Sequence, residues 1–259
     1  MCIITSTVNS VSGTQIYVSS DETYRRQITI YSNRVNTPVD NAMILAVPNP
    51  GSVKFLNFKH YTSLFDDLAS CFGYNFSTRA LASATRSAGT LPVYSVGSYN
   101  ASIVETLREF KRLDEEVFDV ADGLLEFLEE KYAGTGLGFI VCQLKSGTHT
   151  YHPFAYTHHQ HPSGRLFVPT MHYHPHASWK KFTDDDADWD HTIYSSATNL
   201  RSPHWDDKVF KSNKVDWSKF PPEYRWARNV EIDRWEKYGT WKNCDLFATH
   251  TTDPRKWTA

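Results

Sequence analysis

The sequence lacks the features that accompany export, membrane insertion or a disulfide framework. Its four cysteines are widely separated and form no C-x-x-C pair: Cys2, Cys71, Cys142 and Cys244. This spacing favours free thiols in a reducing compartment. No apolar run approaches the roughly 20 residues that span a bilayer, and the start MCIITSTVNS has neither the basic residues nor the apolar stretch of a signal peptide. We therefore expect a soluble, cytoplasmic protein without a membrane partner.

An excess of charge of one sign is also missing. Lys and Arg total 27 and Asp and Glu total 29, so the net charge is −2. A basic patch is the electrostatic footprint of nucleic-acid binding, and this balance predicts no nucleic-acid partner. The chain is 40% hydrophobic and 14% aromatic, which is typical of an ordered globular protein.

Tryptophan is absent from the first two thirds of the chain. All eight tryptophans lie after residue 178: Trp179, Trp189, Trp205, Trp217, Trp226, Trp235, Trp241 and Trp257. This shift predicts a main domain over residues 1–178 and a C-terminal region over 179–259 that packs on it or forms a small subdomain. These tryptophans are interpreted either as core residues stacked by arginine or as a surface for a protein partner or self-assembly.

The remaining patterns predict an α+β protein with an antiparallel β-sheet body, two main amphipathic helices and a Trp-rich C-terminal extension. Short β-branched runs separated by turn residues predict a meander of strands over 3–8, 14–19, 27–32 and 42–48. Further strands are expected within 91–104 and over 139–144. Apolar residues at helical spacing predict helices over about 61–72 and 114–132. A hairpin is expected from 152–158 and 165–174, joined by a turn at 160–164.

Gly134, Gly136 and Gly138 form a G-x-G-x-G run that invites a nucleotide-binding interpretation. A Rossmann phosphate loop follows a strand and precedes a helix. Here the expected helix comes before the glycines and the strand after them. The run therefore predicts a turn that ends the helix.

Several segments follow one another in a recognisable order: AMILAVPNP, VGSYNASIV, FLEEKY, GFIVCQL and RLFVPT. With the early Cys2, this layout resembles a bacterial family known only as a domain of unknown function. The resemblance covers about residues 1–175, and it implies a shared α+β body and no particular activity. The chain departs from that family by lacking the expected export signal and by its His-rich and Trp-rich second half.

Ten of the twelve histidines lie between His149 and His204. Residues two apart on a strand face the same side, so the imidazoles of His172 and His174 could bind one zinc ion. The D-W-D-H segment supplies Asp190 or His191 as a third group, either as a ligand or as a carboxylate orienting a ligand. His152, His158 and His176 are further candidates. The alternative is that these are structural or solvent-facing histidines and that 184–190 forms a solvated acidic loop.

A zinc ion with three protein ligands and a water would permit hydrolysis, although no H-E-x-x-H motif points to a protease. Whether the protein is an enzyme is left open. One rival hypothesis is a non-enzymatic interaction or assembly protein, structural or virion-associated, that uses the Trp-rich region. The substrate or partner is not predicted.

The other rival hypothesis concerns Cys2. Removal of Met1 would leave a cysteine whose own α-amine could act as the base. A Met-Cys start followed by a β-hairpin resembles the cysteine class of N-terminal-nucleophile amidohydrolases. Asp21, Arg25 and Arg26 could be its charged companions, although they match no motif of that class. The alternative is a buried, unreactive Cys2.

Overall fold

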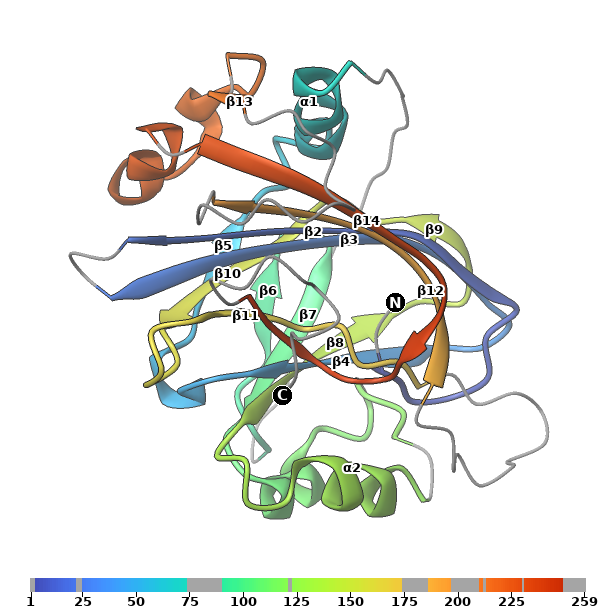
Figure 1. The fold of residues 1–259 in the computed structure, drawn as a ribbon. Coiled ribbons are helices and arrows are strands. Elements are labelled where there is room, and N and C mark those ends of the chain that lie inside the picture. Colours follow the sequence, from blue (N-terminus) through green and yellow to red (C-terminus); the bar gives the residue numbers. More distant parts are fainter. Residues whose placement is uncertain are drawn as a thin grey trace.

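Two large β-sheets packed face to face organise the chain, and helices cover their outer faces (Figure 1). The computed structural model describes residues 3–21, 25–73, 90–120, 123–173, 186–196, 210–211, 213–229 and 231–248. The class predicted from the sequence, α+β with a largely antiparallel sheet body and two main helices, is confirmed.

The first sheet runs through the middle of the molecule. Its strands, in spatial order, are β1 (Ile3–Ile4), β4 (Asn41–Val47), β8 (Gly138–Leu144), β7 (Tyr99–Val104) and β6 (Tyr94–Val96). Every residue of β4 and β8 is buried, because one side of the sheet meets the second sheet and the other meets α2. Burial on both faces explains why their sequences, NAMILAV and GFIVCQL, are almost continuously apolar.

The second sheet is the larger one. Its strands, in spatial order, are β13 (Phe210–Lys211), β14 (Glu231–Lys242), β12 (Asp186–Ser196), β2 (Ser10–Asp21), β3 (Arg26–Thr37), β10 (Phe154–His159) and β5 (Lys54–Asn57), with β9 (Gly147–Thr150) paired to β3. All these pairs are antiparallel except β12 with β2, which run parallel. Through this pairing, strands from both sides of residue 178 form one sheet.

Helical segments cover the outer faces of both sheets. The helix α1 (Leu64–Cys71) and the 3₁₀ segments η3 (Trp217–Lys219) and η4 (Pro222–Asn229) lie over the second sheet. The helix α2 (Leu124–Tyr132) and η2 (Leu107–Arg112) lie over the first sheet, and η1 (Pro50–Ser52) precedes β5. Figure 1 shows α1 and α2 on opposite sides of the sheets. Neither α-helix of the described chain is long and apolar enough to cross a membrane.

The structure corrects four sequence predictions. The helix predicted from residue 114 begins at Leu124, because the Asp114 carboxylate accepts a hydrogen bond from the Glu116 N–H and closes a turn there. The four N-terminal strands exist but do not form one meander, because β1 and β4 belong to the first sheet and β2 and β3 to the second.

The other two corrections concern the histidine region. The hairpin over 152–174 does not form: β10 pairs with β3 and β5, whereas β11 (Leu166–Val168) pairs with β15 (Leu246–Ala248). Residues 186–190 of the predicted acidic loop are part of β12, held between β14 and β2. In both places long-range strand pairing overrode what the local sequence suggested.

Candidate functional site

Most of the described histidines have local structural roles. His149 Nε2 donates to the Ser146 carbonyl over 2.8 Å, and His161 Nδ1 lies 2.8 Å from the Ser163 hydroxyl. His152 accepts from the Ser98 N–H at Nε2 (2.8 Å), so its Nδ1 carries the proton donated to the Pro153 carbonyl (2.9 Å). Both ring nitrogens of His152 are therefore engaged, which removes it from the candidate metal ligands.

Two of the predicted ligands do come together. His191 on β12 and His172, which follows β11, are both buried, and their ring centroids lie 4.8 Å apart. The Trp189 indole packs against both, with centroids 5.0 Å from His172 and 4.6 Å from His191. We call His172, Trp189 and His191 the inner cluster, because it lies between the two sheets, where Trp189 joins the main core.

The backbone of the segment that carries His172 is held firmly. Asn243 accepts from the His172 N–H (2.8 Å) and donates to the His172 carbonyl (2.9 Å). The buried Asp245 carboxylate accepts from the N–H groups of Thr170 (2.7 Å) and Met171 (2.9 Å) and from the Tyr132 hydroxyl (2.7 Å). Burial raises the pKa of Asp245 despite these hydrogen bonds. These contacts fix the position of His172 relative to the segment between β14 (Glu231–Lys242) and β15 (Leu246–Ala248).

Two buried oxygens beside His191 lack hydrogen-bond partners among the described residues. One is the hydroxyl of Thr14, the residue opposite His191 in the parallel register of β2 and β12. The other is Oδ1 of Asp190, 4.0 Å from His191 Nδ1. Buried polar atoms without partners are rare and costly, and both residues line a pocket on the outer face of β12.

The rest of the predicted metal set is separated or lies outside the described residues. Asp190 belongs to the opposite face of β12 from His191, and its Oδ2 accepts from the Gly13 N–H over 2.7 Å. Among the described residues no three His, Cys, Asp or Glu side chains are grouped to hold a metal ion. His174, His176 and Cys2 lie outside those residues.

On the outer face of β12 lies a pocket of about 340 Å³ beneath α1, which we call the outer pocket. It is lined by Gly13, Thr14, Gln15, Ala69, Asp190, Thr192, Tyr194, Arg234, Glu236 and Tyr238. The Arg234 guanidinium donates to the Glu236 carboxylate. Burial raises the pKa of Tyr194 to about 12, so its hydroxyl stays protonated. That hydroxyl lies near Arg234, whose positive charge partly offsets the effect of burial on this pKa.

The sequence predictions missed this pocket. The sequence pattern that could have indicated the pocket is the two-residue alternation in E-I-D-R-W-E-K-Y. It places Arg234, Glu236 and Tyr238 on one face of β14 and the buried Trp235 on the other. The pairing that brings these residues to Asp190 and Tyr194 spans some 40 residues and could not be predicted from local sequence.

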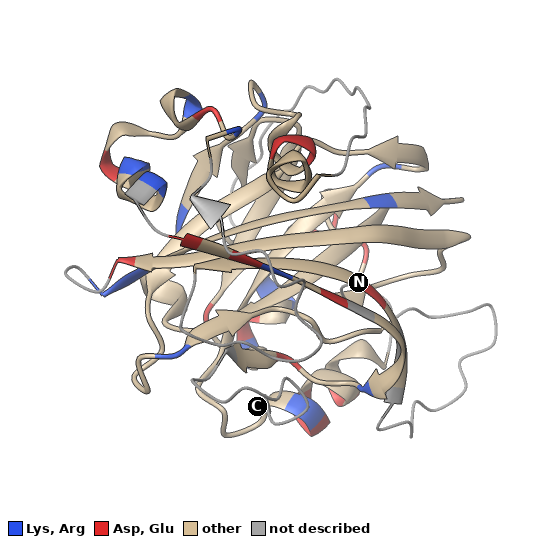
Figure 2. Cartoon of the chain, turned by 45° about the horizontal axis from the view of Figure 1, so that its top comes forward, with Lys and Arg blue, Asp and Glu red and all other residues tan. Residues whose placement is uncertain are grey.

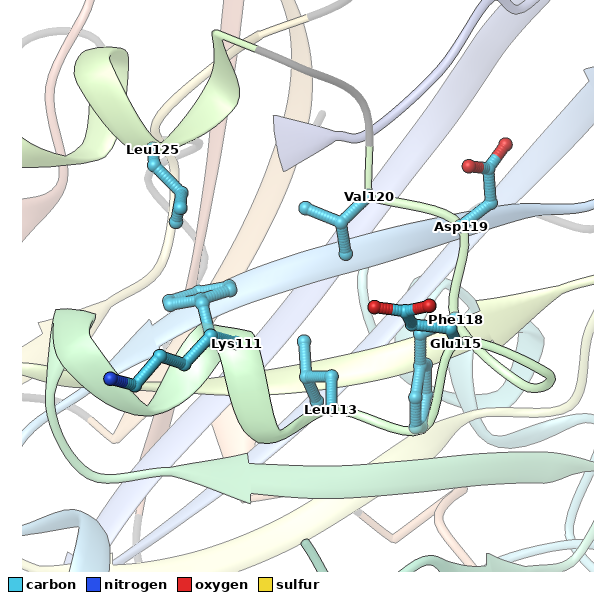
Figure 3. A pocket seen from close by; sticks show the side chains of 8 residues that line it. Lys111, Leu113, Glu115, Phe118, Asp119, Val120 and Leu125 are labelled. Atoms are coloured by element: carbon cyan, nitrogen blue, oxygen red, sulfur yellow. The ribbon is translucent and has the colours of Figure 1, made fainter. Parts of the chain in front are cut away.

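A second pocket, of about 360 Å³, lies between η2 and the start of α2. Figure 3 shows the side chains of Leu113, Val120 and Leu125 pointing into it, while the Lys111 amine and the Asp119 carboxylate point outward. The Glu115 carboxylate lies among the apolar side chains in Figure 3, so the lining is mixed, and the charged groups do not converge on one point.

The tryptophans of the described residues are largely internal. Trp189 and Trp235 are buried in the main core, and Trp217, Trp226 and Trp241 are half-buried. Charged residues of both signs are mixed over the molecule (Figure 2). Neither observation marks out a tryptophan surface for a partner.

The chain is thus an α+β protein of two packed sheets. The imidazole pair lies on the face of β12 that is turned to the core, and the polar pocket lies on its outer face. The sequence matches no family model. Among solved structures, the chain is similar to that of a mutated baculovirus P35 after caspase cleavage, at 13% identity and a TM-score of 0.42, covering 90% of this chain and 91% of that one. A similarity of this size establishes neither a family nor a function.

Proposed function

We propose that the protein binds a divalent metal ion, with zinc as the first candidate, through His172 and His191. The observation that carries the proposal is the 4.8 Å approach of these two rings, which come from segments 19 residues apart. His174, two residues after His172, is the expected third ligand.

The surroundings of the two imidazoles suit a metal site. Zinc is bound by neutral imidazole nitrogens at about 2.0–2.1 Å, and a buried histidine is readily kept neutral by the cost of desolvating its charge. The Trp189 ring restricts the ring planes, and Asn243 fixes the backbone of His172.

The burial of both ligands favours a structural ion over a catalytic one. A catalytic zinc keeps one coordination position open to water and substrate, whereas a structural zinc is enclosed. His191 is fully buried and His172 is 5% exposed. We therefore propose a metal that stabilises the contact between β12 and the segment after β11, and not a hydrolytic centre.

The test is the metal content of protein produced without a histidine tag and without added metal. Elemental analysis of the purified wild type should find about one equivalent of zinc. The double variant His172→Gln and His191→Gln should lose it, because glutamine is a poor zinc ligand.

The matched control is His149→Gln with His161→Gln, two histidines from the same region whose ring nitrogens bind Ser146 and Ser163, close by in the sequence. This variant should keep the metal. Circular dichroism must show that both variants fold. A wild type without bound metal, or a folded His172/His191 variant that retains it, would refute the proposal.

A further inference from the structure

We propose that the outer pocket binds the cationic head of a ligand, a guanidinium or ammonium group such as that of an arginine or lysine side chain. The pocket lies on the opposite face of β12 from the inner cluster and needs no metal ion. Its volume of about 340 Å³ is at the lower end of the range for small-molecule sites, roughly 300–1,000 Å³.

The charges that line the pocket are unbalanced. Asp190 and Glu236 contribute two carboxylates, whereas Arg234 contributes the one guanidinium among the described lining residues. Arg234 is paired with Glu236. Asp190 accepts from the Gly13 N–H, and no described Lys or Arg lies within ion-pair distance of it. One negative charge is therefore left to attract a cation.

The same arrangement disfavours an anionic ligand. Arg234 is 5% exposed, and its guanidinium already binds Glu236. An anion would have to displace that carboxylate and approach Asp190, and like charges brought together in a partly buried site repel each other.

Neutral groups complete a site suited to a planar or alkyl cation. Tyr238 is 56% exposed at the edge of the pocket, where its ring can lie against a cation. The fully buried Tyr194 also lines the pocket, with its hydroxyl near Arg234. Gln15 and Thr192 add further hydrogen-bonding groups.

The experiment compares two probes that differ in charge and not in shape, N-acetyl-arginine amide and N-acetyl-citrulline amide. Binding to the protein is followed by NMR titration. We expect saturable binding of the arginine probe and affinity at least about tenfold weaker for the citrulline probe, because charge-assisted hydrogen bonds are roughly twice as strong as neutral ones.

Three variants locate the site. Asp190→Asn and Glu236→Gln remove charge and keep shape, and Tyr238→Ala removes an exposed ring without disturbing the core. Each should weaken the arginine probe severalfold, whereas Glu115→Gln, at the pocket between η2 and α2, should leave binding unchanged. Equal binding of the two probes, no saturable binding, or arginine binding that survives all three variants would overturn the proposal.

Discussion

His158 illustrates at the scale of one residue why a histidine-rich sequence does not by itself make a metal site. The ring is completely buried, its Nδ1–H donates to the His159 carbonyl (2.8 Å), and its Nε2 has no hydrogen-bond partner among the described residues. Burial lowers the pKa of His158 from 6.5 to about 4. Burial in the core is thus the main determinant of the pKa of His158.

This pKa predicts how stability depends on pH. Between pH 6.5 and about 4 the unfolded chain binds a proton at residue 158 that the folded chain does not. The free energy of unfolding should therefore fall as the pH falls through this window, by up to roughly 3 kcal/mol from this group. Urea denaturation of wild type and His158→Phe at several pH values measures the effect. A variant with the same pH slope as the wild type would show that His158 is not its source.

Asp245 is the second residue whose role can be tested alone. Its carboxylate accepts hydrogen bonds from two backbone N–H groups and from Tyr132. Asp245→Ala should lower the free energy of unfolding by about 3 kcal/mol or more, because it leaves several buried donors without a partner.

Asp245→Asn is the matched control for that prediction. The amide oxygen can still accept from Thr170 and Met171, and the amide N–H₂ can donate to Tyr132. Its cost should be clearly smaller in the same chemical denaturation experiment. Equal losses for the two variants would mean that the network does not hold this segment.

At the scale of the element, β12 determines where the functional groups lie. Alternation along the strand directs Trp189, His191 and Ile193 into the core and Asp190, Thr192 and Tyr194 to the outer pocket. Asp190 and His191 were predicted as alternative members of one site. They are adjacent in sequence but serve two different faces.

The hairpin of β6 and β7 carries a prediction about an element. Gly97 at its turn has φ +66°, and a Cβ there would lie 2.3 Å from His152 Nε2. Gly13 has a similar φ of +62° but no atom within 4 Å of such a Cβ. Both alanine variants bear the cost of a left-handed backbone, about 1 kcal/mol. Gly97→Ala should cost about 2 kcal/mol more than Gly13→Ala, because it also displaces His152.

Thermal or urea denaturation of the two glycine variants decides this. Similar losses of stability would mean that His152 moves aside freely, and that its bonds to Ser98 and Pro153 contribute little.

Local patterns were sufficient to predict much of the fold. The apolar runs of β4 and β8 and the helical spacing around Leu64–Cys71 are signals that a short window contains. Pairings between distant segments, such as β12 with β2 and β11 with β15, are set by the packing of the whole core. The sequence could therefore suggest His172 and His191 as two of several candidate ligands. It could not predict the outer pocket, because that pocket depends on the pairing of β12 with β14.

At the scale of the whole molecule, the strands after residue 178 are integral to the core. Trp189, Ile193, Trp235 and Leu246 belong to the cluster between the sheets. Removing one large buried aromatic side chain costs about 3–5 kcal/mol, while a domain is stable by only about 5–15 kcal/mol. A chain ending at residue 178 should therefore fail to fold cooperatively.

Denaturation of a fragment of residues 1–178, monitored by far-UV circular dichroism, checks this prediction. The expected result is a broad, non-cooperative transition or aggregation. A cooperative transition from a monomeric fragment would instead establish residues 1–178 as a domain that folds by itself.

We propose that one metal ion joins His172 to His191, and NMR of the histidine ring nitrogens can detect this ion at its ligands. Zinc is titrated into metal-free, ¹⁵N-labelled protein, with assignments from the His172→Gln and His191→Gln variants. We expect the resonance of one ring nitrogen of each of these two histidines to move to a metal-bound position, with the change complete at about one equivalent of zinc. Unchanged resonances of both rings, with zinc bound by other histidines or not at all, would contradict it.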